Sequence, residues 1–276
     1  MRMKEEKVKK IGVLGCGWLG LPLAKKLVDE GHKVKGSTTH EEKISSLKSF
    51  GIAPYIVRCS EDNCNGLDLF LQEVEVLILT LPPGLRQNPK RRFDLVIKQI
   101  VKRLVDSAVQ EVIFISSTSV YGDACGDITE ETPTQPITES GKQLLLCEEM
   151  LLNSSSFKTT ILRFGGLIGP QRHPIYPLAK RAFIDNPNGI INFIHLEDCL
   201  QCLLAILEKQ NERVIYNAVC PYYPTRESYY TTIAKIAGVQ LPPFIEKTTN
   251  KRRILPTKIQ NRLNVKFNVE NLLTLN

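Results

Sequence analysis

A glycine pattern near the start of the chain is the feature most suited to binding a ligand. The run GCGWLG at residues 15–20 matches G-x-G-x-x-G, and it lies between an apolar stretch at residues 10–14 and a helical pattern at residues 18–30. A second apolar stretch follows at residues 34–38. Strand, glycine turn, helix and strand in this order are typical of a dinucleotide-binding unit, so a plain strand-to-helix turn is the weaker interpretation.

Each position in this turn has an expected physical role. Gly15 allows the tight turn, Gly17 lets the backbone approach a pyrophosphate, and Gly20 lets helix and strand pack closely. Trp18 and Leu19 begin the helix, whose amides would face the phosphates. We therefore expect these five residues to line an NAD(P) site.

The end of the second strand predicts which dinucleotide binds. NAD-preferring sites place an Asp or Glu there to hold the ribose hydroxyls, whereas this chain has STTH at residues 37–40. Thr38, Thr39 and His40, with Lys43 nearby, suit the 2′-phosphate of NADP. The two glutamates after His40 argue for NAD, which stays the alternative.

A second loop is expected beside the cofactor. Leu81 and Pro82 open the sequence LPPG directly after a predicted strand at residues 74–80, where the ribose and nicotinamide of a dinucleotide would pass. Proline and glycine there also suit a simple turn, and the sequence leaves both interpretations open.

The alternation of β-branched runs and helical patterns predicts an α/β fold, a Rossmann-type doubly wound parallel sheet. The other expected elements are helices at residues 41–50, 89–109 and 142–152 and strands at residues 55–57, 112–116 and 159–163. The helix at 89–109 would have about six turns. Repeated prolines beyond Gly169 predict a smaller C-terminal substrate lobe. We place the NAD(P)-binding domain at residues 1–169 and the lobe at 170–276, with residues 190–218 returning to the main sheet.

Composition sets the broad class. The chain has 276 residues, 42% of them hydrophobic, which suffices for a full α/β core and a smaller domain. The first ten residues are charged and no long apolar segment follows, so we expect a cytoplasmic protein without a signal peptide or membrane span. The net charge of +7 is spread along the chain without interleaved aromatics, which disfavours nucleic-acid binding.

Eight cysteines are scattered through apolar and mixed segments, and we expect reduced thiols. Cys199 and Cys202 form a CxxC, but the helical pattern around them favours packing within a helix over metal or redox chemistry. No metal site is expected.

Three further segments carry a resemblance to a known family. They are SSTSVYG at residues 116–122, LRFGGLIGP at residues 162–170 and NFIHLED at residues 192–198. Over nearly its whole length the chain resembles the extended short-chain dehydrogenase/reductases, which include NDP-sugar epimerases and dehydratases. With its glycine turn and the segments YNAV at 216–219 and TRE at 225–227, it is similar to an atypical, YeeZ-like branch of that superfamily.

The resemblance implies a catalytic set. Family members use a Ser or Thr to orient the substrate, a Tyr to pass a proton, and a Lys that binds the nicotinamide ribose and lowers the pKa of the Tyr. Ser117 and Lys142 match the first and last positions, but Thr138 stands four residues before Lys142, where the Tyr is expected. A threonine hydroxyl is a far weaker acid than such a phenol. Tyr121 is the nearest substitute donor, although in relatives this residue supports the loop or lines the substrate site.

Three more polar residues have alternative roles. His195 and Asp198 match the IHxxD motif by which relatives tie the small domain to the sheet, and a structural role is preferred over a metal site. Arg163 is either an anion clamp or a strand-end ion pair.

Two functions are compatible with these observations. The first is an NADP-dependent oxidoreductase or epimerase/dehydratase that acts on a small substrate, with a sugar nucleotide as the candidate, through Ser117 and Lys142. The second is a non-catalytic NAD(P)-binding sensor or regulatory protein, which the missing Tyr favours. The sequence decides neither this question nor the choice between monomer and homodimer.

Overall fold

A seven-stranded sheet is the central element of the computed structural model, which describes residues 8–209, 212–246 and 251–275. Its strands are β1 (Lys10–Leu14), β2 (Lys33–Thr38), β3 (Ala53–Ile56), β6 (Val76–Leu79), β7 (Glu111–Ser117), β9 (Lys158–Phe164) and β13 (Val214–Ala218). They pair in the order β13-β9-β7-β6-β1-β2-β3. The pairs from β3 to β7 are all parallel. After β1 the chain adds β2 and β3 on one side of it, and then returns to add β6 and β7 on the other side. A switch point therefore lies at the carboxyl ends of β1 and β6.

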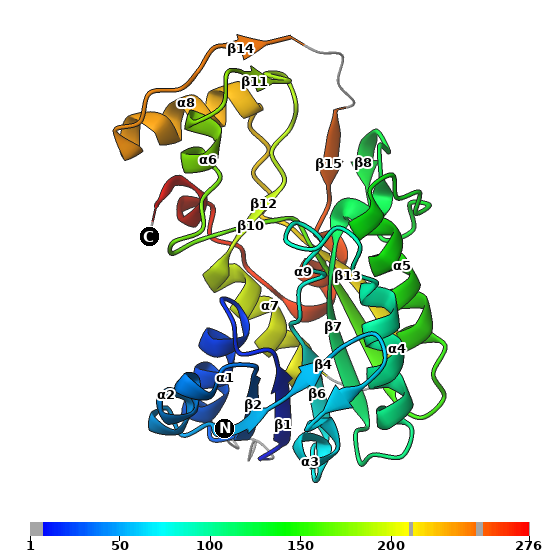
Figure 1. The fold of residues 1–276 in the computed structure, drawn as a ribbon. Helices are drawn as coiled ribbons and strands as arrows, with labels where there is room; N and C mark the ends of the chain where they lie inside the picture. The colour runs from blue at the N-terminus through cyan, green and yellow to red at the C-terminus, as the bar shows by residue number, and fades with distance from the viewer. Residues whose placement is uncertain (1–7, 210–211, 247–250, 276) are drawn as a thin grey trace, which may run out of the picture. The chain divides into compact units, whose positions relative to one another are not determined.

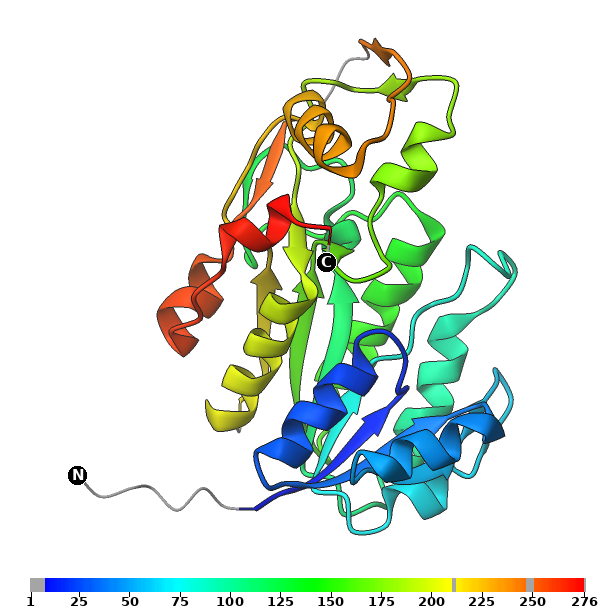
Figure 2. The same cartoon turned by 90° about the vertical axis from the view of Figure 1, so that its left-hand side faces the viewer.

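Helices fill the connections on both faces of this sheet. They are α1 (Gly20–Asp29), the short η1 (Glu41–Lys43), α2 (Ile44–Ser49), α3 (Leu67–Leu71), α4 (Phe93–Leu104) and α5 (Glu139–Leu152). Figures 1 and 2 show α1 on one face and α4 and α5 on the other. Helix α1 buries Leu23 and Leu27 against the sheet, and Gly31 with φ +85° ends it, since only glycine adopts that conformation freely. The predicted Rossmann-type α/β fold is confirmed.

The helix expected at residues 89–109 is shorter than the sequence pattern indicated. Residues 88–91 form a turn closed by the Arg91 amide and the Asn88 carbonyl at 3.1 Å, and α4 begins only at Phe93. The Phe93 amide donates to the Gln143 side chain at 2.7 Å, so a partner outside the helix caps its first turn. The helix also ends at Leu104 rather than at residue 109, although the apolar periodicity continues to Ala108.

A hairpin that the sequence analysis missed contains a disulfide. The short strands β4 (Arg58–Cys59) and β5 (Cys64–Asn65) pair antiparallel, with Cys59 opposite Cys64. The two Cα atoms are 4.0 Å apart and the sulfurs are bonded. The expectation that all eight cysteines are reduced is therefore wrong for this pair, because the hairpin register brings the two side chains together. The other six are free thiols.

The chain divides into two compact units, which we describe separately. The first contains residues 8–116, 142–161 and 212–214, and the second contains residues 117–141, 162–209, 215–246 and 251–275. The division passes through α5, between Gly141 and Lys142. The domain boundary at residue 169 inferred from the sequence stays a prediction. The charged start of the chain, residues 1–7, lies outside the described residues.

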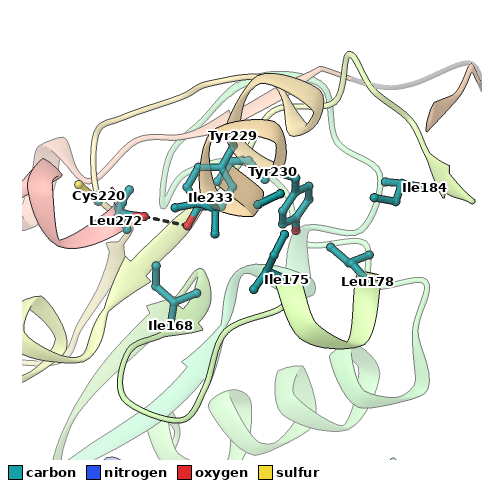
Figure 3. Close-up of a cluster of buried hydrophobic side chains, with 11 residues drawn as sticks. Ile168, Ile175, Leu178, Ile184, Cys220, Tyr229, Tyr230, Ile233 and Leu272 are labelled. Carbon is teal, nitrogen blue, oxygen red and sulfur yellow. Dashed lines mark hydrogen bonds between the residues drawn. The ribbon is translucent and has the colours of Figure 1, made fainter. Parts of the chain in front are cut away.

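The second unit consists of short elements around its own apolar cluster. Its strands and helices are η2 (Thr118–Tyr121), β8 (Gly126–Ile128), β10 (Gly166–Ile168), α6 (Ile175–Ala179), β11 (Ile184–Asp185), β12 (Phe193–His195), α7 (Leu196–Lys209), α8 (Arg226–Ala237), β14 (Phe244–Ile245), β15 (Arg252–Ile254), α9 (Thr257–Leu263) and η3 (Val269–Leu273). Ile168, Ile175 and Ile233 are buried in the cluster. Figure 3 shows the Tyr229 hydroxyl directed at the Leu272 carbonyl, 2.9 Å away, which fastens η3 to α8.

Helix α7 carries the CxxC and the Asp198 of the IHxxD motif, whereas His195 is the last residue of β12. Cys199 and Cys202 are fully buried free thiols, as expected of residues that pack within a helix. Asp198 is also fully buried, and its Oδ1 accepts a hydrogen bond from the Asn268 amide at 3.1 Å. The Asp198 Oδ2 has no hydrogen-bond partner among the described residues. Asp198 therefore ties η3 to α7, which is a structural role.

No helix in the described parts of the chain is long and apolar enough to cross a membrane.

The burial of Asp198 predicts a pH-dependent stability effect. Burial raises the pKa of this carboxyl from 3.8 to about 6, so the folded protein favours its neutral form. The stability that Asp198 contributes is then complete below pH 3.8 and is lost as the pH rises through about 6. We expect Asp198→Asn to raise the free energy of unfolding by about 1–3 kcal/mol at pH 8 and by less at pH 4.5, as measured by urea unfolding. An equal effect at both pH values would contradict this account.

Candidate functional site

The glycine turn at residues 15–20 is held by strands on both sides of β1. The Gly15 amide donates to the Ser37 Oγ at 2.8 Å, and the Cys16 amide donates to the Ser37 carbonyl, also at 2.8 Å. Directly after β6, the Thr80 hydroxyl donates to the carbonyl oxygens of Leu14 at 3.1 Å and Gly15 at 2.7 Å. The turn is thus fixed at the switch point of the sheet.

The glycines of the turn differ in the space around them. A Cβ on Gly20 would overlap the Gly15 carbonyl oxygen and would lie 2.8 Å from the Thr80 Oγ1. A Cβ on the exposed Gly17 would meet no atom within 4 Å. Gly20 is therefore required for packing of α1 on β1, whereas at Gly17 the backbone faces open space.

The other two residues of the motif lie at the start of α1. Leu19 is buried and occupies the N-cap position, and Trp18 is half-buried. The first turn of α1, which is fully described, contains no acidic residue that would repel a phosphate.

The carboxyl end of β2 presents both buried and exposed polar groups. Thr38 is buried, and its Oγ1 accepts a hydrogen bond from the His40 amide at 3.1 Å. Thr39 and His40 are exposed. Burial raises the pKa of the Cys16 thiol in the turn to about 12, while the backbone hydrogen bond with Ser37 and the charge of Lys43 act in the opposite direction.

The loop after β6 lies against the glycine turn. The Leu81 Cδ2 is 3.0 Å from the position that a Cβ on Gly15 would occupy, so the Leu81 side chain covers the turn. Pro82 is exposed, and Gly84 bends the loop with φ +74°. The loop therefore makes a turn at Gly84, and its first residue, Leu81, lies next to the glycine turn.

The predicted catalytic residues belong to different units. In the second unit, the Ser117 Oγ accepts a hydrogen bond from the Ser119 amide at 3.1 Å, and the Thr138 Oγ1 accepts one from the Gly141 amide at 3.1 Å. A Cβ on Gly141 would lie 2.9 Å from the Ser119 carbonyl and 3.1 Å from the Thr138 Oγ1, so the segments that carry Ser117 and Thr138 lie side by side. Lys142, in the first unit, is exposed in the first turn of α5.

Tyr121 is enclosed in a buried polar network. It has no exposed surface, and its hydroxyl donates to the Asn217 Oδ1 at 2.8 Å and accepts from the Arg163 Nη1 at 2.8 Å. The Arg163 guanidinium lies 4.9 Å from the centre of the Tyr121 ring, and the backbone amide of Asn217 donates to the Glu130 carboxylate at 2.7 Å. Burial raises the pKa of Tyr121, although the charge of Arg163 opposes this. These contacts suit support of the loop better than proton transfer to a substrate, and Arg163 serves this network.

Comparison with known proteins identifies the family. The model of the NAD dependent epimerase/dehydratase family matches residues 11–218. The chain belongs to the NAD-dependent epimerase/dehydratase family. It is 38% identical to Protein YeeZ of Escherichia coli K12 over 243 residues, which cover 86% of this chain and 87% of YeeZ. An NAD(P)-binding, epimerase-like function follows from this membership.

Solved structures of low sequence identity share the fold. The UDP-Glc/GlcNAc 4-epimerase from Campylobacter jejuni superposes with a TM-score of 0.82 at 19% identity, and the alignment covers 96% of each chain. The UDP-glucuronic acid 4-epimerase from Bacillus cereus, in complex with NAD, gives a TM-score of 0.79 at 20% identity, also over 96% of each chain. At these identities the likeness shows the fold alone.

The turn of this epimerase/dehydratase family member fits a dinucleotide. The open space at Gly17 lies where the G-x-G-x-x-G fingerprint brings a pyrophosphate to the backbone, and α1 begins directly behind it. Gly15, Gly17, Trp18, Leu19 and Gly20 would hold the phosphates.

Two residues that support the turn were not among the predicted site residues. Ser37 was named only within the run STTH at the end of the second strand, and Thr80 was not among the predicted residues. The available signal was a hydroxyl residue at the carboxyl end of a buried strand, which is where polar groups of open α/β sheets gather. Among the described residues, no group of three or more His, Cys, Asp or Glu side chains is placed to hold a metal ion.

The contrast between Gly17 and Gly20 gives a paired test of the site. Because a Cβ at the exposed position 17 meets no atom within 4 Å, Gly17→Val should fold normally and bind NADPH at least about 100-fold more weakly. As the matched control, Gly20→Ala should lower the free energy of unfolding by about 2 kcal/mol or more, because its Cβ overlaps backbone. Thermal unfolding and fluorescence titration measure the two effects. A folded Gly17→Val protein with unchanged affinity would place the cofactor elsewhere.

Proposed function

We propose that this protein is an NADP-dependent enzyme of the epimerase or oxidoreductase type that acts on a nucleotide-linked sugar. The observation that carries the proposal is the glycine turn, closed at Gly20 and open at Gly17, beside a strand end without a carboxylate at residues 37–40. Family membership and the UDP-sugar epimerases among the solved relatives support the substrate class.

The preference for NADP rests on the groups at the end of β2. Thr39 and His40 are exposed there, and Lys43, which follows them in the chain, is exposed as well. The two glutamates that argue for NAD both have basic neighbours: Glu42 lies 3.1 Å from the His40 Nδ1, and Glu41 lies 3.6 Å from a guanidinium nitrogen of Arg58. Carboxylates with such neighbours oppose a 2′-phosphate less than isolated ones would.

Ser117 and Lys142 are the residues proposed for the chemistry. The Ser117 Oγ accepts the Ser119 amide, so its own hydrogen stays available to donate to a substrate oxygen. Lys142 supplies a positive charge for the nicotinamide ribose, and a bound NADP supplies hydride transfer. Leu81 and Pro82 would complete the cofactor site from the loop after β6.

The proton donor is the open part of this proposal. Thr138 has a hydroxyl, but an aliphatic alcohol does not exchange protons efficiently near neutral pH. Tyr121 has the required phenol, but its hydroxyl is bonded to Arg163 and Asn217. We therefore expect any donor to be a substrate group, a water molecule or a residue outside the family's usual set.

Thr138 also supports a second candidate function. A protein that binds NAD(P) without catalysis, as a sensor or regulatory partner, has no need of a phenol at this position. The two candidates differ in whether a sugar nucleotide binds when the dinucleotide is present.

Ligand binding separates the two candidates. We expect the purified protein to bind NADPH at least about 10-fold more tightly than NADH, because Thr39, His40 and Lys43 can accommodate the added phosphate. With NADPH bound, UDP-glucose or UDP-glucuronic acid should then raise the midpoint of thermal unfolding if the protein is an enzyme. Dinucleotide binding without any sugar-nucleotide shift would favour the sensor, and tighter NADH binding would contradict the NADP preference.

Restoring the phenol tests whether the remaining catalytic groups are in place. Thr138→Tyr should raise the rate of NADP reduction with a bound sugar nucleotide by about 10-fold or more, because a positioned general acid–base group contributes about 10²–10⁴-fold. Thr138→Phe is the matched control, with the same ring and no hydroxyl. Equal rates for the two variants would show that the surrounding groups no longer support the family reaction.

A further inference from the structure

The hairpin of β4 and β5 follows β3 in the chain, and its start lies beside the end of β2. In its register Arg58 lies opposite Asn65, and Cys59 lies opposite Cys64. The Ser60 amide donates to the Asn63 carbonyl at 2.7 Å and closes the tip. A covalent bond between the two cysteine sulfurs locks the hairpin one residue after Arg58.

The Arg58 side chain reaches back to the residues that follow β2. Its Nη2 donates to the Thr39 carbonyl at 3.0 Å and lies 3.6 Å from the Glu41 carboxylate. The backbone follows the same path, since the Val57 amide donates to the Thr38 carbonyl at 3.1 Å. About half of the Arg58 side-chain surface, 53%, is exposed, so the guanidinium is open to a ligand.

This position is close to where the adenosine ribose of a dinucleotide would lie. The end of β2 contacts the glycine turn directly through the Ser37 bonds to the Gly15 and Cys16 amides. In this kind of site the ribose hydroxyls meet the residues just after β2, while the pyrophosphate meets the turn. Arg58 is bonded to one of these residues, Thr39.

We propose that Arg58 recognises the 2′-phosphate of NADP, and that the Cys59–Cys64 pair controls this recognition through its oxidation state. This inference rests on the proposed NADP-binding function. A guanidinium is planar and always charged, and its paired N–H groups match two phosphate oxygens. The exposed Glu41 carboxylate is a weaker partner that a dianionic phosphate would displace.

The disulfide is suited to a local effect. The sequence separation of the two cysteines is only 5, and the stabilisation expected from a disulfide is smallest for short loops. Its main consequence is to fix the hairpin, and with it the backbone that carries Arg58. Ordering such a segment before the ligand binds reduces the entropy lost on binding, so the oxidised form should bind NADPH more tightly.

The redox step needs only a thiol–disulfide exchange. Cys64 is buried and Cys59 is partly exposed, so a thiolate from solution reaches the Cys59 sulfur first. That thiolate forms a mixed disulfide with Cys59 and releases the Cys64 thiolate. A second small thiol then attacks the mixed disulfide, and the products are two protein thiols and one small-molecule disulfide. Oxidation is the reverse, with a small disulfide such as oxidised glutathione accepting the two electrons.

Substitution of Arg58 tests the recognition. Arg58→Ala should weaken NADPH binding about 10- to 100-fold, the range expected for loss of charge-assisted hydrogen bonds, and change NADH binding less than about 3-fold. Arg58→Lys should lie between wild type and Arg58→Ala. Arg103→Ala is the matched control, because Arg103 is in the same unit, 47% exposed, and paired with Asp68 at 3.4 Å. If Arg58→Ala binds NADPH as tightly as wild type, the inference about Arg58 is wrong but the proposed function stands. If wild type binds neither NADPH nor NADH, the proposed function is wrong as well.

The redox state is tested on the full-length protein by the same titration. We expect wild type treated with oxidised glutathione to bind NADPH about 3- to 10-fold more tightly than wild type in reductant. The double variant Cys59→Ser, Cys64→Ser should give the reduced value under both conditions, and the variant of the exposed Cys125, Cys125→Ser, should respond like wild type. Thiol counting in denaturant should find two fewer thiols in the oxidised wild type. Eight titrating thiols after oxidation, or equal affinities in both states, would overturn the redox control.

Discussion

The close contact between the start of α1 and the end of β1 is the constraint on which the site depends. Gly20 lies so near the Gly15 carbonyl that no side chain fits between them, and the Thr80 hydroxyl bonds that same carbonyl at 2.7 Å. Ser37 holds the amide of Gly15 from the other side. Three neighbouring strands are thereby joined to one turn, and the backbone at Gly17 is left facing open space. If helix and strand separated here, the amides at the helix start would no longer point to one place.

The same strand end shows how polar groups are divided between support and binding. Ser37 and Thr38 are buried, and their hydroxyl oxygens accept hydrogen bonds from backbone amides, whereas Thr39 and His40 are exposed. A buried hydroxyl left without a partner would cost free energy, so inward-facing residues acquire structural roles. Only the outward-facing residues, and Arg58 bonded to Thr39, stay available to a ligand.

Structural support also accounts for the hydrogen bonds of a predicted catalytic residue. Tyr121 has the chemistry of a proton donor, but the second unit uses its hydroxyl to connect Arg163 with Asn217 in a buried network. Charged and polar groups in such an environment are costly to leave unpaired, so the network holds the phenol in place. Thr138 and Ser117 lie on adjacent segments because Gly141 permits their close approach. Family membership is thus clear from the chain, while the substitution of Thr138 for the family's Tyr stays a prediction from the sequence.

The sequence by itself determined the glycine turn, the order of the main strands and helices, and the family, because these depend on local patterns of apolar residues and on a short motif. The strand expected at residues 10–14 is β1 as observed, and that expected at 112–116 is β7 but for one residue at each end. Only the tertiary structure decided the start of α4, the Cys59–Cys64 pair, the enclosure of Tyr121 and the contact of Arg58 with Thr39. Each of these features depends on a contact between residues or segments that no local sequence pattern predicts. Such contacts are set by packing and hydrogen bonding in three dimensions rather than by periodicity along the chain.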